Sequence, residues 1–303
     1  FFFKTFNFLK LNCFFSIFFL ALATDLVVTI TLNFFFKSFS ASKTPNCPVP
    51  PTIIAIDFFM DIFTYIMLVK KKILIFTATY NEKDNIEQLI RSINFHNSKV
   101  DILIIDDNSP DLTFKKIEDL KIEFNNINLI VRTSKSGLDT AHKEAYEYAI
   151  KNDYDYLITM DADLSHDPSE INNFIKFLDQ FPFVIGSRYI KGGRCEMKGR
   201  RLIMSKVGNK LIKKILKINC HEFTTSYRGF NLKKLKNFHL NLVLNKGYSF
   251  FMGTVYEISR LNFQIKEIPI VFKDRKKGNS KIPKIEIFRT LINLLLLVLN
   301  KKN

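Results

Sequence analysis

Two carboxylates separated by one residue, Asp161 and Asp163, follow an apolar run, Tyr154–Met160, that is typical of a buried strand. A strand ending in Asp-x-Asp sets both groups at the mouth of a sheet, where they repel each other unless a cation lies between them or one is protonated. A hard divalent cation such as Mg²⁺ binds one or two carboxylates and shares its other positions with phosphate oxygens. The alternative is an ordinary turn, because Asp and Pro, here Pro168, are common in turns.

Polar clusters also follow two other apolar runs. Thr79–Glu82 closes the run Ile73–Thr79, and Asp106-Asp107 closes Val100–Asp107. Ligands of open parallel sheets bind beyond the carboxyl ends of the strands, so we expect all three clusters at one edge of one sheet. Three unrelated turns do not explain this arrangement, which favours a site for a cation and a phosphate-bearing ligand.

The segments that must position these residues alternate between strand and helix. Further strands are expected at Ile127–Val131 and Phe183–Ser187. Helices are expected where apolar residues recur at a spacing of three or four: Ile86, Leu89, Ile90 and Ile93, then Ile117, Leu120 and Phe124, then the segment Thr140–Ile150. Units of about thirty residues predict an α/β domain with a mostly parallel sheet, covered by helices on both faces. Neither common glycine-rich phosphate loop occurs, so a bound nucleotide would depend on carboxylates and a metal.

The composition of the chain suggests its size class, its compartment and the chemical classes of its partners. The 303 residues suffice for one large domain or two modest ones, and the four scattered cysteines fit a reducing compartment rather than a zinc or disulfide framework. From Met67 onward the chain has 41 basic and 26 acidic groups, an excess that suits phosphates, anionic lipid or nucleic acid. A codon bias toward Lys is the competing explanation for part of this excess.

Both ends of the chain are apolar. Residues 1–66 contain apolar runs interrupted by Asp, a costly group inside a bilayer, and a Pro-rich linker. They are either a poor membrane anchor or translated upstream sequence before Met67; we favour the second. The expected domains are residues 67–281 and a C-terminal apolar helix, residues 282–303, which is too short to span a bilayer and should be interfacial or packed. Gly199–Lys217 predicts a cationic helix that lies in membrane headgroups or packs on the sheet.

Seven motifs in order allow a closer assignment. They are TATYNE (77–82), DDNSPD (106–111), SGLDTA (136–141), MDADLSHDP (160–168), GSRYIKGG (186–193), RLIMS (201–205) and EIPIVFKDRKKGNSK (267–281). The set closely resembles the dolichyl- and polyprenyl-phosphate mannosyltransferases, inverting enzymes of glycosyltransferase family 2 with a GT-A (Rossmann-like) fold. The resemblance implies transfer of mannose from GDP-mannose to a polyprenyl or dolichyl phosphate. Open alternatives are another donor such as UDP-glucose, or a non-catalytic nucleotide-binding membrane adaptor. A phosphotransferase of the haloacid-dehalogenase type is disfavoured, because its Asp-x-Asp motif would end the first strand.

The resemblance also implies a site, residue by residue. The donor would contact Ala78, Tyr80, Glu82, Ile105, Asp107, Asp161, Ala162 and Asp163. Mg²⁺ or Mn²⁺ would bind Asp161, Asp163 and Ser165. Arg188, Arg201 and Ser205 would meet the acceptor phosphate, and Arg275 and Lys281 would close over the donor phosphates. The catalytic roles would fall to Asp161, Asp163, Arg188 and Arg275.

This chemistry needs cations more than a base. The leaving diphosphate develops charge that a metal and arginines can stabilise, and the acceptor phosphate is already an anion. His166 is therefore expected to be a hydrogen-bonding turn residue rather than a base. The implied partners are a sugar nucleotide, a polyprenyl phosphate, a membrane surface and a small anchoring subunit, with no nucleic acid. We expect a location at the cytoplasmic face of a membrane, held peripherally or by an N-terminal anchor.

Overall fold

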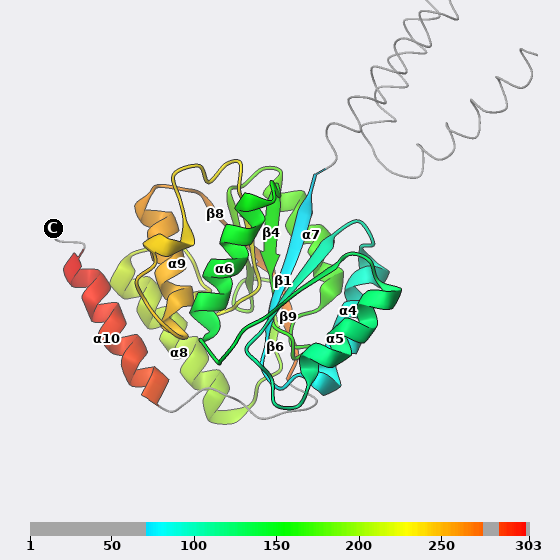
Figure 1. Cartoon of the computed structure of the whole chain (residues 1–303). Coiled ribbons are helices and arrows are strands. Elements are labelled where there is room, and N and C mark those ends of the chain that lie inside the picture. The colour runs from blue at the N-terminus through cyan, green and yellow to red at the C-terminus, as the bar shows by residue number, and fades with distance from the viewer. Residues whose placement is uncertain (1–70, 275–284, 301–303) are drawn as a thin grey trace, which may run out of the picture. The chain divides into compact units, whose positions relative to one another are not determined.

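The computed structural model describes residues 71–274 and 285–300, where a seven-stranded sheet lies between two layers of helices (Figure 1). The strands lie in the order β3-β2-β1-β4-β7-β5-β8. Their bounds are β1 Ile73–Thr79, β2 Asp101–Asp106, β3 Ile127–Val131, β4 Tyr156–Thr159, β5 Phe183–Ser187, β7 Arg228–Asn231 and β8 Ile265–Pro269. A short second sheet pairs β6 (Arg194–Cys195) with β9 (Val271–Phe272).

All pairs in the large sheet are parallel except those made by β7, which runs antiparallel to both β4 and β5. Successive residues of β1 face opposite layers: Ile73 and Ile75 belong to one hydrophobic core, Leu74 and Phe76 to the other. This is why β1 is a continuous apolar run rather than an alternating one.

Helices cover both faces of the sheet (Figure 1). One face is packed by α4 (Lys83–His96), α5 (Thr113–Glu123) and α7 (Ile171–Leu178), the last preceded by the short helix η1 (Pro168–Glu170). The other face is packed by α6 (Leu138–Lys151), α8 (Gly199–Leu216), α9 (Ser249–Arg260) and α10 (Ile285–Asn300), with η2 (Leu240–Leu242) beside them. The predicted α/β class with a mostly parallel sheet and helices on both faces is confirmed.

The strand β7 was not anticipated from the sequence. Its residues, RGFN, are polar at both ends and contain Gly229. They form a strand by pairing with β4 and β5, and Gly229 lies against Leu178 and Phe174 of α7, where a Cβ would come within 2.9 Å of the Leu178 side chain. Only a glycine lets the sheet and α7 approach this closely.

The basic helix α8 has two apolar sides. Ile212 and Leu216 are buried in the core that also contains Leu294 and Leu297 of α10. Ile203, by contrast, is 62% exposed. One side of α8 therefore packs over the sheet, as one of the two interpretations predicted; another side is apolar and exposed, and its location in membrane headgroups stays a prediction. Among the described residues, no helix has the length and apolar character needed to cross a bilayer.

His142 of α6 is buried among aromatic rings, with centroids 5.0 Å from Phe76 and 5.1 Å from Phe251. Burial, assisted by the charge of Arg228, lowers the pKa of His142 to about 3. The unfolded chain binds a proton at this residue below about pH 6.5, whereas the folded chain does not until about pH 3. The contribution of His142 to stability is therefore complete above about pH 6.5 and is lost as the pH falls toward 3.

We predict that His142→Gln removes part of this acid sensitivity. Between pH 7 and pH 5 the wild type should lose about 2 kcal/mol more unfolding free energy than the variant, because only the wild type has this proton to gain on unfolding. Urea unfolding at both pH values measures the difference. His96→Gln, at the partly exposed end of α4, is the matched control and should follow the wild type. Equal pH dependence in wild type and His142→Gln would contradict the prediction.

Candidate functional site

The carboxyl ends of β1 and β2 meet at one edge of the sheet. Thr79 lies opposite Asp106 in the register, and its hydroxyl donates a 2.7 Å hydrogen bond to that carboxylate. The backbone N–H of Asp107 donates to the carbonyl of Thr79 at 3.0 Å. The structure thus brings the first two predicted polar clusters into direct contact.

Asp107 is held by two partners on the loop after β3. Its Oδ1 accepts from Arg132 at 3.0 Å, and its Oδ2 accepts from the N–H of Gly137 at 3.2 Å. Arg132 also binds Glu144 of α6 at 2.8 Å. Gly137 has φ 99°, which a residue with a side chain adopts only under strain. Asp107, which is predicted to contact the nucleotide, is therefore fixed by hydrogen bonds to both of its carboxylate oxygens.

The other predicted donor residues surround this point. Ala78 and Ile105 are paired neighbours on β1 and β2. Tyr80 carries the ammonium of Lys135 over its ring, 3.8 Å from the centroid. Glu82 is the N-cap residue of α4 and accepts a 2.8 Å hydrogen bond from Asn85. Tyr80 and Glu82 thus follow the end of β1, and Ala78 and Ile105 lie near the ends of β1 and β2.

The Asp-x-Asp loop follows β4 and turns sharply. Leu164 has φ 63°, an uncommon conformation for a residue with a side chain. The turn lets both the N–H and the hydroxyl of Ser165 donate to Asp163 Oδ1, at 3.0 Å and 2.5 Å. Asp163, Ala162 and Ser165 are all buried. The loop is thus closed by its own side chains.

Asp161 is held from a different direction. The hydroxyl of Ser226, just before β7, donates to Asp161 Oδ1 at 2.5 Å. The N–H of Asp161 donates to His166 Nδ1 at 3.1 Å, which leaves the proton of the neutral ring on Nε2, facing Thr225 Oγ1 at 3.2 Å. Burial lowers the pKa of His166. The ring is a neutral support for the loop in this arrangement.

Arg188 lies at the end of β5 and is almost fully buried. It makes a two-pronged ion pair with Glu222, from Nε at 2.7 Å and from Nη2 at 2.8 Å. Burial disfavours both charges, but their mutual attraction and hydrogen bonds outweigh it, so the pKa of Arg188 is raised and that of Glu222 is lowered. Both members of the pair, the Arg188 guanidinium and the Glu222 carboxylate, are therefore charged.

The predicted acceptor residues lie toward α8. The hydroxyl groups of Ser205 and Tyr189 are 2.6 Å apart, which links α8 to the residue beside Arg188. Arg201 is exposed and lies 3.9 Å from Asp274. The backbone N–H of Lys273 donates to the Ser165 carbonyl at 3.0 Å, so the chain just after β9 lies beside the Asp-x-Asp loop. Arg275 and Lys281 lie outside the described residues.

The donor set of this loop fits a hard divalent cation. Asp161 and Asp163 offer carboxylate oxygens, Ser165 a hydroxyl oxygen, and no nitrogen or sulfur ligand stands among these three predicted ligands. Such oxygen ligands suit Mg²⁺ or Mn²⁺, which leave coordination positions for diphosphate oxygens. Each carboxylate keeps its orientation through a hydroxyl donor, Ser226 for Asp161 and Ser165 for Asp163.

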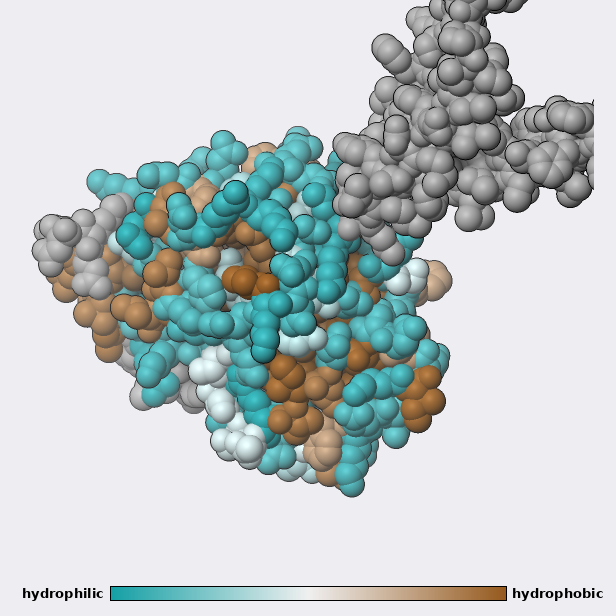
Figure 2. All heavy atoms as spheres, turned by 45° about the horizontal axis from the view of Figure 1, so that its top comes forward, coloured by the Kyte–Doolittle hydropathy of each residue, from teal (hydrophilic) through white to brown (hydrophobic). Residues whose placement is uncertain are grey.

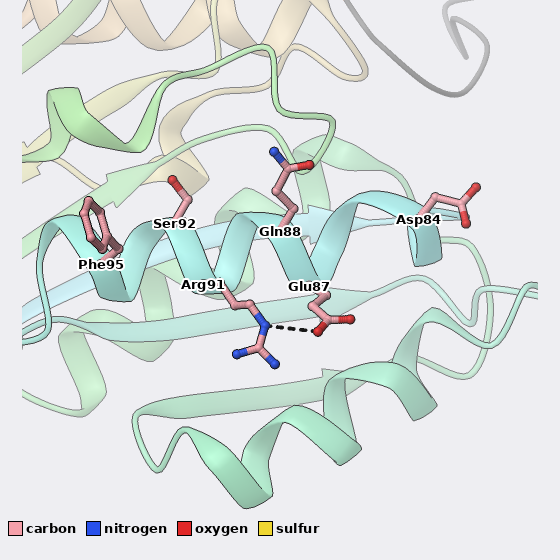
Figure 3. A pocket seen from close by; sticks show the side chains of 6 residues that line it. All are labelled: Asp84, Glu87, Gln88, Arg91, Ser92 and Phe95. Atoms are coloured by element: carbon pink, nitrogen blue, oxygen red, sulfur yellow. Dashed lines mark hydrogen bonds and ion pairs between the residues drawn. The ribbon is translucent and has the colours of Figure 1, made fainter.

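A hollow of about 590 Å³ lies elsewhere, on the outer side of α4 (Figure 3). Its lining residues, including Asp84, Gln88 and Phe95, all project from this single helix. Arg91 is paired with Glu87 at 3.0 Å and with Glu123 at 2.6 Å. Its charged lining residues Arg91 and Glu87 are already paired with Glu123 and Lys116 of α5, and none of the predicted site residues lines it, so we do not place the site there.

Four residues that contact the predicted site were not predicted from the sequence: Arg132, Glu222, Thr225 and Ser226. Arg132 directly follows the predicted strand Ile127–Val131, and the other three belong to one segment before β7. The signal available was an acid, Glu222, followed within four residues by three hydroxyl side chains. That pattern marks a hydrogen-bonding loop, but it does not identify the partners.

The fold and the site define a glycosyltransferase with a GT-A-like architecture. The sequence profile described as Glycosyl transferase family 2 matches residues 74–238. The chain belongs to this family and is a sugar-transferring enzyme.

Relatives and solved structures agree with this assignment. The chain is 32% identical over 215 residues to a polyprenol monophosphomannose synthase of Mycolicibacterium smegmatis, covering 70% of this chain and 81% of the relative. It is 29% identical over 212 residues to an undecaprenyl-phosphate mannosyltransferase of Micrococcus luteus, covering 70% and 87%. Glucosyl-3-phosphoglycerate synthase from Mycobacterium tuberculosis, crystallised with Mn²⁺, UDP and its product, shares the fold with a TM-score of 0.54 at 14% identity, covering 76% and 80%.

Proposed function

We propose that this enzyme transfers mannose from GDP-mannose to a polyprenyl phosphate, giving polyprenyl phosphate mannose. The observation that carries the proposal is the 32% identity to a polyprenol monophosphomannose synthase, across the segment that contains both the Asp-x-Asp loop and Arg188. The proposal is supported by the neighbouring parallel strands β1, β2 and β4, whose carboxyl ends lead into residues that resemble a donor site in sequence.

The donor half would use the ends of β1, β2 and β4. Asp107, fixed by Arg132 and Gly137, is suited to orient the nucleoside. Asp161 and Asp163 would hold a divalent cation, which supplies charge stabilisation to the leaving diphosphate when bound. Their orientation by hydroxyl groups means that little rearrangement is needed at the moment of reaction.

The acceptor half would lie between Arg188 and α8. A phosphate monoester is already an anion at neutral pH and attacks without a strong base, provided that it is held in line. Arg188, Arg201 and Ser205 provide cationic and hydroxyl groups there. The neutral, hydrogen-bonded His166 is consistent with a reaction that needs no proton acceptor at this loop.

A lipid acceptor requires access to a membrane. Exposed apolar side chains gather on two neighbouring helices, with Ile203 and Val207 on α8 and Ile292, Leu295 and Leu299 on α10. Figure 2 shows hydrophobic side chains on the side of the molecule where Figure 1 draws α10. Such a surface, flanked by the lysines and arginines of α8, suits an anionic bilayer.

A second feature supports a peripheral membrane position. A hollow of about 420 Å³ between the loop before α9 and α10 has Leu244 and Ile292 in its lining, with Lys246 and Arg289 beside them. Apolar and cationic groups side by side match the boundary between acyl chains and headgroups. We propose that the enzyme lies on the cytoplasmic face, since Cys195 and Cys220 are free thiols that suit a reducing compartment. The anchoring subunit stays a prediction.

A transfer assay tests the proposed function. The full chain is incubated with Mg²⁺ or Mn²⁺, a radiolabelled sugar nucleotide, and undecaprenyl or dolichyl phosphate, and label is counted in the organic phase. We expect label from GDP-mannose to enter the lipid. Transfer from UDP-glucose with none from GDP-mannose would overturn the proposed donor, and no transfer from any sugar nucleotide to either lipid would overturn the proposal as a whole.

The membrane surface makes a separate prediction. Ile292→Glu combined with Leu295→Glu places two charges on the exposed side of α10 and should lower binding to phosphatidylglycerol vesicles by at least about tenfold, because apolar area is lost and like charge is added. Co-sedimentation measures it. Phe95→Glu combined with Ile122→Glu, at exposed positions of α4 and α5 on the opposite face of the sheet, should leave binding unchanged. Equal loss in both double variants would argue against the surface.

A further inference from the structure

The segment Glu222–Ser226 contacts both halves of the site. At one end Glu222 binds Arg188, and at the other end Ser226 binds Asp161. Between them Thr225 faces His166, and Thr224 accepts from Arg188 at 2.7 Å. Five consecutive residues thus join the predicted cation loop to the predicted acceptor arginine.

The geometry at Arg188 leaves one nitrogen for a ligand. A guanidinium has five N–H groups. Glu222 takes Nε and one N–H of Nη2, and Thr224 takes the other N–H of Nη2. The guanidinium also lies over the rings of Tyr189 and Phe272, with its carbon 5.1 Å from each centroid. Among the described residues, Nη1 is the only nitrogen of this group with no hydrogen bond.

The segment itself is held by α8. Asn209 of α8 accepts from the N–H of Phe223 at 2.7 Å and is buried. Glu222 also accepts from the N–H and the hydroxyl of Thr224, at 3.0 Å and 2.9 Å. Every oxygen of this buried carboxylate is therefore engaged, and its position is determined by the backbone of its own loop and by one helix.

We propose that Glu222 is a positioning residue, which turns the Arg188 guanidinium so that Nη1 alone is presented to an anionic oxygen, and that its segment links this arginine to Asp161. The proposal rests on the proposed function in taking that oxygen to belong to the acceptor phosphate. Glu222 cancels the charge of Arg188, so the pair orients the phosphate by hydrogen bonds rather than attracting it by net charge. Attraction from a distance is left to the exposed cations, such as Arg201.

Glu222→Gln separates orientation from attraction. The Gln amide keeps the shape of the side chain but has no charge and one acceptor fewer. The positive charge of Arg188 is then no longer neutralised, and the orientation of its guanidinium is no longer fixed. We expect kcat for polyprenyl phosphate to fall by about tenfold to a hundredfold, with an acceptor KM that does not rise. A merely structural role would instead lower the melting temperature and raise the KM values of donor and acceptor together. Glu222→Asp should recover part of kcat, because it restores the carboxylate.

The matched control is Glu257→Gln. Glu257 is paired with Arg260 at 2.7 Å on α9, away from the segment, and its loss should leave kcat unchanged. If Glu222→Gln does not fold, Thr224→Val removes the hydroxyl that accepts from Arg188 and donates to Glu222, and it should lower kcat in the same direction. Wild-type kinetics in Glu222→Gln, or an acceptor KM that rises while kcat is kept, would overturn the proposal.

The two ends of the segment give different readouts. Ser226→Ala should weaken Mn²⁺ binding by about tenfold, because the hydroxyl that orients Asp161, a proposed ligand of the cation, is lost. Glu222→Gln should leave the Mn²⁺ affinity unchanged. Water proton relaxation measures both. Unchanged Mn²⁺ affinity in Ser226→Ala would refute the link to Asp161. If the wild type transfers no sugar, the proposed function fails, and the role of Glu222 is read from donor-free binding of farnesyl phosphate. Glu222→Gln should bind this probe at least as tightly as wild type; weaker binding would refute the role.

Discussion

Replacing Asp163 with Asn is expected to lower kcat for mannosyl transfer by about a hundredfold to a thousandfold, while the fold is retained. Asp163 is buried, and its Oδ1 accepts from Ser165 twice. Asn keeps an oxygen that can accept these bonds, so the loop keeps its shape. It removes a full negative charge from the proposed cation site, and a cation held by one carboxylate is bound more weakly and stabilises the leaving diphosphate less.

The measurement is the transfer assay at saturating donor, repeated over a range of Mn²⁺ concentrations. Asp167→Asn is the matched control on the same loop, because Asp167 caps η1 and pairs with Lys273 at 2.7 Å rather than joining the proposed cation ligands. It should keep kcat within about threefold, as expected for a partly exposed ion pair. Transfer at the wild-type rate by Asp163→Asn at low Mn²⁺ would show that this carboxylate does not hold the cation.

Replacing Arg228 with Met is expected to lower the free energy of unfolding by about 2 to 4 kcal/mol. Arg228 is fully buried on β7 and donates to three backbone carbonyls, those of Thr225, Phe251 and Phe223, at 2.8, 2.8 and 3.0 Å. Met fills much of the same volume but leaves these carbonyls without that donor. Burial lowers the pKa of Arg228 to about 9, so removing the charge recovers some desolvation cost. Three lost hydrogen bonds outweigh that gain.

Urea unfolding compares Arg228→Met with Arg260→Met. Arg260 is half-exposed and pairs only with Glu257 three residues earlier among the described residues, so its loss should cost under about 1 kcal/mol. Because Arg228 anchors the loop that contains Thr225, we also expect the Mn²⁺ affinity of Arg228→Met to fall with its stability. Equal stability of the two variants would mean that the carbonyls find other donors.

Local pattern was sufficient for most of the framework. The apolar runs at β1, β2 and β4, followed by polar clusters, predicted the parallel pairing of these strands and the edge at which Thr79, Asp106 and Asp161 lie. The reason is that a strand buried on both faces must be continuously apolar, and the chain can only become polar where the strand leaves the core. The site residues carried over from the resemblance stay predictions: the structure describes all of them except Arg275 and Lys281, and it does not assign their chemistry.

The strand β7 and its loop were beyond the reach of local pattern. RGFN has no strand signal, and its pairing between β4 and β5 depends on contacts with α7, about fifty residues earlier in the chain. The same holds for α8, whose composition predicted an amphipathic helix but not which of its apolar residues would be covered. That outcome depends on where α10 packs, as shown by the shared core of Ile212 and Leu294.

The sequence by itself determined the strands β1 to β5, the helices α4 to α6, the polar edge and the Asp-x-Asp loop, because each depends on residues close together in the chain. Only the tertiary structure decided that Glu222 would face Arg188 across 34 positions and Ser226 would face Asp161 across 65. A buried charge must find a partner, but sequence spacing does not say which one. The Asp-x-Asp loop from which the site was first recognised is thus oriented in part by a segment that no local pattern connects to it.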